Sequence, residues 1–396
     1  MEHRPTYHEG RVTVELLHPE VFLRERGHLA RDFGVAAIAA LQQARLTFTT
    51  PQGAELYRLP VPEPLVVAET FAGTGIRSFR YFLEVGGVAE ALLNDISTPA
   101  LETARHNAAR LGLDRRIRFY HMEANNFHYT LKLEELFPHV LDLDAFGSPV
   151  PFLDSAFHAV RDGGFLYITA TDLAALCGID RRSAFNHYAA LTVQTEFCHE
   201  TGARVFVRTV VRAGARRKFR VIPLFTLFDG YALRGFFFTI HGRYDLDPRS
   251  EGFLGICPAC HTVWSVPFSG KDLCNRCPRC GEEAWMAGPL WLWDLHHPGF
   301  LEAMETAGRS LGTLSRRFFR VIRRMREEVG LPPFFYTTTA VADRLDLSQP
   351  PLAEVLEALR QRGYAARRTH FHGTGFKTTA PYAEVAEVFR QLVRPA

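Results

Sequence analysis

Short apolar runs alternate with segments of helical periodicity through the first half of the chain. The runs are residues 65–68, 88–93, 117–120, 140–143 and 165–169. Residues 76–83 after the first run and residues 98–111 after the second carry apolar side chains at helical spacing. Strands that alternate with helices are typical of βαβ units, so the pattern predicts an α/β fold with a parallel sheet.

Glycines and acids follow four of these runs closely. Gly73 and Gly75 lie in the turn after the first run, and Asp95, Glu123 and Asp144 follow the next three. Parallel sheets bind ligands outside the carboxyl ends of their strands, where glycines allow the backbone to approach a ligand. Any one of the acids could instead cap the helix that follows it. Their common place at strand ends favours a shared ligand site.

The glycine turn and the acids together indicate the kind of ligand. Asp95 stands about 20 residues after Gly75, the spacing at which an acid of a nucleotide-binding fold reaches ribose hydroxyls. The third glycine of a dinucleotide turn is missing, because Ile76-Arg77-Ser78 follows Gly75. S-adenosylmethionine therefore fits better. Asp95 would bind its ribose, Glu123 its adenine amine, and Arg77 or the turn backbone its amino acid part.

The run Asp144-Ala-Phe-Gly indicates chemistry on an exocyclic amine. The lone pair of such an amine is delocalised into the base ring, so a carboxylate that accepts its N–H would assist its attack on a methyl group. Asp144 would be ionised at pH 7 and could accept this hydrogen bond. Phe146 would stack on the base, although it could also belong to the core. Methyltransferases of adenine and cytosine amines usually have two prolines after the acid, so this run predicts another base.

Five of the seven cysteines lie between residues 257 and 280. Cys257-Pro-Ala-Cys260 and Cys277-Pro-Arg-Cys280 are two C-x2-C pairs with 16 residues between them, which is a spacing typical of zinc sites. Four thiolates leave no open coordination position, so we predict a structural Zn²⁺ held by these four residues. Cys274 is an alternative ligand, because Cys274-Asn-Arg-Cys277 is also C-x2-C.

Arginines gather in the second half of the chain. The 46 basic and 43 acidic residues give a net charge of only +3, which by itself indicates no polyanionic partner. Residues 309–326, however, contain seven arginines and no acid. Helical spacing predicts one amphipathic helix over these residues, with Arg309, Arg316, Arg320 and Arg323 on one face opposite apolar residues. We predict that Arg316, Arg320 and Arg323 bind RNA phosphates. A second basic group at 212–220 follows an expected strand at 205–211 and would contact the same RNA backbone.

Five runs of residues together resemble one enzyme family. They are Phe71-Ala-Gly-Thr-Gly-Ile-Arg77, Asn94-Asp-Ile-Ser97, Glu123-Ala-Asn125, Asp144-Ala-Phe-Gly-Ser-Pro149 and Thr169-Ala-Thr-Asp-Leu-Ala-Ala-Leu-Cys-Gly178. In these runs the chain resembles the tRNA guanine-26 N2-dimethyltransferase family. The resemblance continues from His8-Glu-Gly10 to Gly375-Phe-Lys-Thr378 and so covers nearly the whole chain.

The resemblance implies an S-adenosylmethionine-dependent enzyme that methylates the N2 amine of guanine 26 in tRNA, usually twice. The site residues that it implies are Arg31, Arg77, Asp95, Glu123 and Ala124 for the cofactor, Asp144 for catalysis, and Phe22 and Phe146 for the guanine. The chain departs from the family at Ala145, where proline is common, at Glu123, where aspartate is common, and at Arg24-Glu25, where Asn-Pro is common. Single or double methylation, and targets beyond position 26, stay open.

We expect three parts in the chain. Residues 1–250 are predicted to form a Rossmann-like class I methyltransferase domain, residues 251–290 a zinc-binding connector, and residues 291–396 a smaller α+β, winged-helix-like domain that binds RNA. The last prediction depends on an expected helix at 351–360 and an expected strand pair within 364–377.

Other features bear on location and on alternative functions. No run approaches the about 20 apolar residues of a membrane helix, so we expect a cytoplasmic protein without a membrane partner. The oligomeric state stays open. Two other functions also stay open: an enzyme of the same fold that acts on another RNA base, RNA position or protein amide, and a noncatalytic zinc-bearing protein that binds RNA.

Overall fold

The computed structural model of the chain describes residues 4–21, 23–49, 55–61, 64–242, 246–269 and 275–393. The chain forms two compact units, each built from segments that are distant in sequence. Unit 1 contains residues 1–171, 211–244 and 297–322, and unit 2 contains residues 172–210, 245–296 and 323–396. The functional division into residues 1–250, 251–290 and 291–396 stays a prediction.

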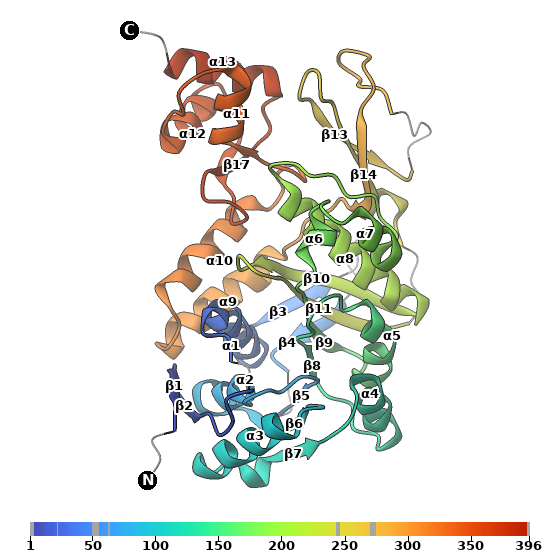
Figure 1. Cartoon of the computed structure of the whole chain (residues 1–396), viewed down its shortest axis with the longest axis vertical. Helices are drawn as coiled ribbons and strands as arrows, with labels where there is room; N and C mark the ends of the chain where they lie inside the picture. Colours follow the sequence, from blue (N-terminus) through green and yellow to red (C-terminus); the bar gives the residue numbers. More distant parts are fainter. Residues whose placement is uncertain are drawn as a thin grey trace. The chain divides into compact units, whose positions relative to one another are not determined.

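A seven-stranded sheet forms the centre of unit 1 (Figure 1), with the strand order β10-β11-β9-β8-β5-β6-β7. The strands are β5 (Leu65–Glu69), β6 (Val88–Asn94), β7 (Ile117–Tyr120), β8 (Val140–Leu143), β9 (Gly164–Ala170), β10 (Phe219–Phe228) and β11 (Leu233–His241). Neighbours from β5 to β9 are parallel, whereas β11 is antiparallel to both β9 and β10. All five predicted strands and the mostly parallel sheet are confirmed.

Helices cover both faces of this sheet. They are α1 (His28–Gln43), α2 (Ile76–Arg80), α3 (Thr98–Arg110), α4 (Ala124–Leu133), α5 (Val150–Ala159) and α9 (Pro298–Leu311). Figure 1 shows α1 and α9 on one side of the sheet, and α4 and α5 on the other. Two antiparallel strand pairs also belong to the unit, β1 (Thr6–Glu9) with β2 (Val12–Glu15) and β3 (Leu46–Thr49) with β4 (Glu55–Leu59).

Aromatic side chains fill the space between α1 and the sheet. The Phe33 ring of α1 lies 5.3 Å from Phe225 of β10 and 4.9 Å from Phe318, and Phe225 stacks on Phe236 of β11 at 5.6 Å. These four rings are at most 1% exposed. Burial of each contributes about 1.5–3 kcal/mol to stability, so the antiparallel strands are firmly packed against α1.

Unit 2 contains two small sheets and several helices. One sheet has the order β13-β12-β14, with β12 (Glu251–Ile256), β13 (Val263–Pro267) and β14 (Trp285–Trp291). The other has the order β15-β17-β16, with β15 (Tyr336–Thr337), β16 (Ala366–Arg368) and β17 (Gly375–Thr378). The helices are α6 (Leu173–Leu176), α7 (Arg181–Tyr188), α11 (Thr338–Leu345), α12 (Leu352–Gln361) and α13 (Tyr382–Leu392).

The C-terminal residues of unit 2 form their own hydrophobic core. Side chains of α11, α12 and α13 pack with Phe376 of β17 and Tyr336 of β15. The helix predicted at 351–360 and the strand pair predicted within 364–377 are both confirmed as α12, β16 and β17. This part is a small α+β arrangement.

Two predictions of secondary structure need correction. The strand predicted at 205–211 lies inside α8 (Cys198–Arg216), where every residue from Val205 to Val211 except Arg208 and Thr209 is buried. A helix that is buried on most sides has no clear apolar stripe, and its valines imitate a strand. The basic residues 309–326 are divided between α9 and α10 (Arg316–Glu328), because Gly312 ends α9 with a left-handed φ of 70°. Among the described residues, no helix is long and apolar enough to cross a membrane.

Candidate active site

A cavity of about 330 Å³ opens at the carboxyl ends of β5, β6 and β8 in unit 1. Six residues predicted for the site line it, and they are Arg31, Gly73, Arg77, Asp95, Asp144 and Phe146. The described residues that line it do not include Gly75, Glu123 or Ala124. Phe22 lies outside the described residues, so its contact with the guanine stays a prediction. The strand ends therefore bring most, but not all, of the predicted residues together.

The glycine turn after β5 is held in place by Asp95. One carboxylate oxygen of Asp95 accepts a hydrogen bond from the backbone N–H of Gly73 at 2.9 Å, and the other accepts one from Ser97 at 2.9 Å. Gly75 has a φ of 76°, and a Cβ there would come within 2.5 Å of the Phe79 ring. Asp95 thus fixes the shape of the cavity wall, and glycine is required at position 75 for both conformation and space.

Asp144 lies between two arginines. Its Oδ2 accepts a hydrogen bond from Arg77 at 2.6 Å, and its Oδ1 accepts one from Arg234 at 2.8 Å. Arg77 also donates to Asp142 at 2.6 Å, and Arg234 donates to Asp229 at 3.0 Å. The side chains of Arg77 and Arg234 are 7% and 6% exposed, whereas the Asp144 side chain is 30% exposed. The carboxylate is therefore held rigidly and still faces the cavity.

The arginines also determine the charge of Asp144. Burial opposes ionisation of this carboxyl group, but the positive charges of Arg234 and Arg77 outweigh it and hold the pKa of Asp144 well below its ordinary value. At Asp142 burial has the larger effect. It raises the pKa of this carboxyl group to about 6, although the positive charge of Arg77 acts in the opposite direction. Asp144 is therefore ionised at neutral pH, where it can accept hydrogen bonds and is a weak proton acceptor.

Phe146 is not a core residue. Its side chain is 77% exposed at the cavity, which excludes the alternative that it packs inside the protein. The turn that carries it is anchored to the end of β9, because the backbone N–H of Gly147 donates to Thr171 Oγ1 at 2.6 Å and Thr171 N–H donates back to the Gly147 carbonyl at 2.9 Å. A ring fixed in this exposed position can stack on a base.

The Arg31 side chain is bound by the N-terminal hairpin. Its Nε donates to both oxygens of Glu9 at 2.8 and 2.9 Å, and its guanidinium also donates to the carbonyl of Arg24. Arg80 donates to the same Glu9 carboxylate at 2.7 Å. Arg31 is only 8% exposed, yet it lines the cavity. Glu9, which belongs to the run His8-Glu-Gly10 but was given no role there, therefore positions a predicted cofactor residue.

Glu123 acts as a helix cap. Its carboxylate accepts hydrogen bonds from the backbone N–H groups of Asn125 at 2.8 Å and Asn126 at 3.1 Å, at the start of α4. Glu123 is thus one of the acids that cap the helix following their strand. Its contact with an adenine amine stays a prediction, and so does the contact of Ala124 with the cofactor.

Arg234 is a site residue that the sequence did not reveal. It comes from β11, an antiparallel strand about 90 residues after Asp144, and it also donates to Thr169 Oγ1 at 2.8 Å. The only local signal is an arginine within the apolar run of β11. A buried arginine inside a central strand needs an acidic partner, but the sequence does not show which one.

Comparisons with known proteins agree with this geometry. Residues 4–390 match the family model of N2,N2-dimethylguanosine tRNA methyltransferases. The chain belongs to this family. It is 31% identical to the tRNA (guanine(26)-N(2))-dimethyltransferase of Methanothermobacter thermautotrophicus, over 98% of this chain and 99% of that protein. It is 30% identical to the tRNA (guanine(26)-N(2)/guanine(27)-N(2))-dimethyltransferase of Aquifex aeolicus, over 83% of both chains.

A solved structure is similar over the same length. Trm1 from Pyrococcus horikoshii, in complex with S-adenosyl-L-methionine, has a TM-score of 0.80 and 27% identity, and the match covers 97% of this chain and 99% of that one. The class I methyltransferase fold predicted for the first part of the chain is thereby confirmed for this member of the dimethyltransferase family.

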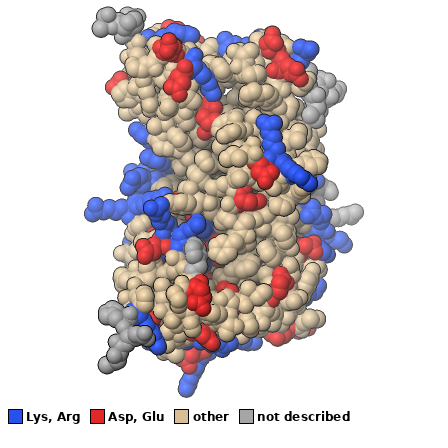
Figure 2. Space-filling view, in the orientation of Figure 1, with Lys and Arg blue, Asp and Glu red and all other residues tan. Residues whose placement is uncertain are grey.

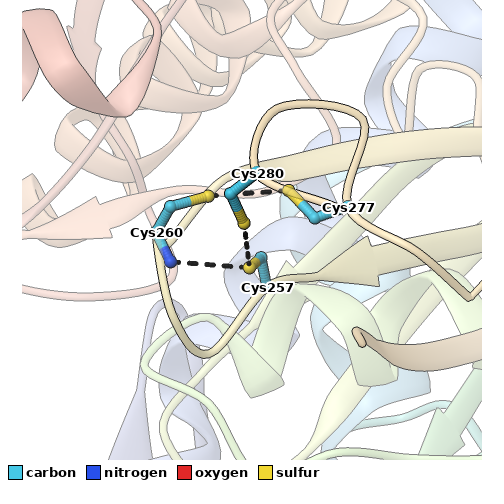
Figure 3. Close-up of side chains that lie close together, drawn as sticks. All are labelled: Cys257, Cys260, Cys277 and Cys280. Carbon is cyan, nitrogen blue, oxygen red and sulfur yellow. Dashed lines mark hydrogen bonds between the residues drawn. The ribbon is translucent and has the colours of Figure 1, made fainter. Parts of the chain in front are cut away.

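The four predicted zinc ligands of this family member come together in unit 2. Figure 3 shows the side chains of Cys257, Cys260, Cys277 and Cys280 converging from two loops. The sulfur atoms of Cys257 and Cys280, and those of Cys260 and Cys277, are 3.5 Å apart. Cys274 lies outside the described residues, so its alternative role is not decided.

The two cysteine loops have the same backbone hydrogen bonds. His261 N–H donates to the Cys257 carbonyl at 3.0 Å, and Gly281 N–H donates to the Cys277 carbonyl at 2.9 Å. Each loop also directs one N–H to a sulfur at 3.4 Å, from Cys260 in the first and Arg279 in the second. Two matched loops with four soft sulfur donors fit tetrahedral Zn²⁺ without an open position.

The amphipathic character predicted for the arginine helix is confirmed in α10. Phe318, Ile322 and Met325 are fully buried, whereas Arg316, Arg320 and Arg323 are exposed. Figure 2 shows Lys and Arg side chains protruding at the edge where Figure 1 places α10. The second basic group, at 212–220, extends from the end of α8 into β10 rather than following a strand.

Proposed function

We propose that this chain is an S-adenosylmethionine-dependent enzyme that methylates the N2 amine of guanine 26 in tRNA, and that it adds two methyl groups. The observation that carries the proposal is the Asp144 carboxylate, which faces the cavity between Arg77 and Arg234 at 2.6 and 2.8 Å. Membership of the dimethyltransferase family and the cofactor named for the Pyrococcus horikoshii relative support it.

The cavity suits this cofactor in shape and in charge. Bound S-adenosylmethionine supplies a methyl group on a positively charged sulfur. Gly73 and Thr74 of the turn line the space where its amino acid part would lie, together with Arg31 and Arg77. Asp95 would meet the ribose with the lone pairs that its two backbone hydrogen bonds leave free.

Asp144 would act by holding the amine of the guanine. Each carboxylate oxygen has a second lone pair besides the one directed at an arginine, so one oxygen can accept an N2–H of the base. This hydrogen bond localises electron density on the nitrogen as it bonds to the methyl carbon. Because its pKa is strongly depressed, Asp144 would pass the released proton to solvent rather than keep it. Phe146 would stack on the ring of the extruded guanine.

The remaining parts of the chain would bind tRNA and stabilise the fold. Cys257, Cys260, Cys277 and Cys280 would hold a structural Zn²⁺ that ties the two cysteine loops together. Arg316, Arg320 and Arg323 would contact tRNA phosphates, and the C-terminal α+β part, which we propose to be winged-helix-like, would bind the same RNA. The exposed arginines of α10 and the absence of acids in 309–326 support this assignment.

Nucleoside analysis tests the proposal. The purified chain is incubated with unmodified tRNA transcripts and S-adenosylmethionine, and the digested RNA is examined by mass spectrometry. We expect N2,N2-dimethylguanosine, with N2-methylguanosine as an early product. A methylated adenosine or cytidine would instead indicate an enzyme that acts on another base. RNA binding without any methylated nucleoside would indicate the noncatalytic alternative.

A further inference from the structure

The loop between β10 and β11 presents an aromatic ring among arginines beside the candidate active site. Tyr231, at the tip of this loop, is 40% exposed. The guanidinium carbons of Arg24 and Arg26 lie 5.2 and 5.8 Å from the centre of its ring, and Arg26 also donates a hydrogen bond to its hydroxyl group. Arg317 of α10 donates to the carbonyl of Asp229 in the same loop at 3.2 Å.

These residues border a second cavity in unit 1. Its volume is about 600 Å³, and Arg26, His28, Tyr231 and Arg317 line it. Binding sites for small ligands usually measure about 300–1,000 Å³. Arg24 lines the methyl-transfer cavity and Arg26 lines this one, so the segment that carries both arginines is shared by the two cavities.

A chain of hydrogen bonds ties the Tyr231 loop to the catalytic carboxylate. Asp229 Oδ1 accepts the backbone N–H groups of Tyr231 and Ala232, both at 2.9 Å, and thereby fixes the turn. Asp229 Oδ2 accepts from Arg234 at 3.0 Å, and Arg234 donates to Asp144 at 2.8 Å. The position of Tyr231 is therefore set by the same arginine that positions Asp144.

We propose that Tyr231, Arg26 and Arg317 form a nucleotide-binding subsite that holds the RNA nucleotide adjacent to the methylated guanine. A guanine at Asp144 must leave its stack, so its neighbours need a new surface on which to stack. Unpaired bases are typically bound by stacking on aromatic rings and on arginine planes, and arginines pair with their phosphates. The cavity contains one acid, Asp229, which is 4% exposed and already paired with Arg234, so its accessible charge is positive.

A purely structural role for the Tyr231 ring does not account for its surroundings. The loop is already fixed through Asp229, which contacts the backbone of Tyr231 rather than its ring. Both arginines on the ring are exposed, and Arg26 lines a cavity that also contains Arg317. Binding of a ligand with a flat base and a phosphate therefore explains this arrangement better than a role in folding does.

Kinetics with a full tRNA transcript test the subsite, which rests on the proposed function. Stacking on an aromatic ring contributes about 1–3 kcal/mol per base, so Tyr231→Ala should raise KM for tRNA by about 5- to 150-fold and leave the affinity for S-adenosylmethionine unchanged. Tyr231→Phe keeps the ring and should stay within about threefold of the parent. Tyr129→Ala is the matched control, because Tyr129 is 42% exposed on α4 and lies outside both cavities.

Crosslinking gives a readout that does not depend on catalysis. A photoreactive phenylalanine analogue at position 231 should crosslink to the nucleotide on one side of guanine 26, whereas the same group at position 129 should not. A tRNA KM of Tyr231→Ala equal to that of Tyr129→Ala, or a crosslink distant from guanine 26, would overturn the subsite. If the parent chain transfers no methyl group but the crosslink next to guanine 26 forms, the proposed function fails and the subsite stands.

Discussion

Replacement of Asp144 by asparagine removes one negative charge and almost no volume. In the parent, the two carboxylate oxygens accept charged hydrogen bonds from Arg77 at 2.6 Å and Arg234 at 2.8 Å. In Asp144→Asn one oxygen becomes an NH₂ group that faces an arginine donor. The variant thus keeps a single acceptor oxygen and loses the negative charge that would polarise the guanine amine, and it also leaves two buried guanidinium groups with less compensating charge.

The two losses have different sizes. Removing one preorganised electrostatic group from an active site lowers the rate by about 10²- to 10³-fold, which corresponds to about 2.7–4 kcal/mol of activation free energy. The stability loss should be smaller than the about 3–5 kcal/mol of breaking a fully buried pair, because the Asp144 side chain is 30% exposed and Asp142 and Asp229 still neutralise the arginines. Asp144→Asn should therefore fold at 25 °C and be almost inactive.

Single-turnover methylation with saturating enzyme and labelled S-adenosylmethionine measures the rate, and thermal unfolding measures the stability. Asp142→Asn is the matched control, because Asp142 pairs with the same Arg77 at 2.6 Å but is 4% exposed and does not line the cavity. We expect a stability loss in both variants and the large rate loss only in Asp144→Asn. Equal rates for the two variants would refute the catalytic role of Asp144.

Three further predictions concern RNA binding, the metal and pH. Replacing Arg316, Arg320 and Arg323 together by glutamine should lower tRNA affinity and reduce the slope of log affinity against log salt by about 2–3, as measured by filter binding at several salt concentrations; an unchanged slope would exclude α10 from the interface. Elemental analysis should find one zinc per chain, and Cys260→Ser should lose it together with thermal stability; a metal-free parent of equal stability would contradict the assignment. The pKa of Glu9 is lowered to about 2 because the hydrogen bond and charge of Arg31, with the charge of Arg80, outweigh burial. Glu9→Gln should therefore lower the free energy of unfolding at pH 7, and its difference from the parent should shrink as pH falls from about 4.5 toward 2; a difference independent of pH would contradict this assignment.

The grouping of residues at the strand ends is predictable from the sequence, because parallel neighbouring strands end at the same edge of a sheet. The carboxyl ends of β5, β6 and β8 therefore lie together, and Gly73, Asp95 and Asp144 all line one cavity. The exposure of Phe146 could not be predicted in this way, because Ala145, which is nearer to the end of β8, is buried.

Other features depend on contacts that no local pattern records. Arg234 reaches Asp144 from an antiparallel strand, and the Arg31 side chain depends on Glu9 of a hairpin. Glu123 shows the limit of strand-end reasoning, because an acid before a helix satisfies the first N–H groups whether or not a ligand is near. The segment 205–211 has the apolar pattern of a strand because α8 is buried there on nearly all sides.

The most direct test of the account is mass mapping of a tRNA transcript after reaction with the chain and S-adenosylmethionine. Nuclease fragments that contain guanine 26 should gain the mass of two methyl groups, and a transcript with adenine at position 26 should not gain it there. Methylation of the adenine-26 transcript to the same extent and at another position would contradict the account.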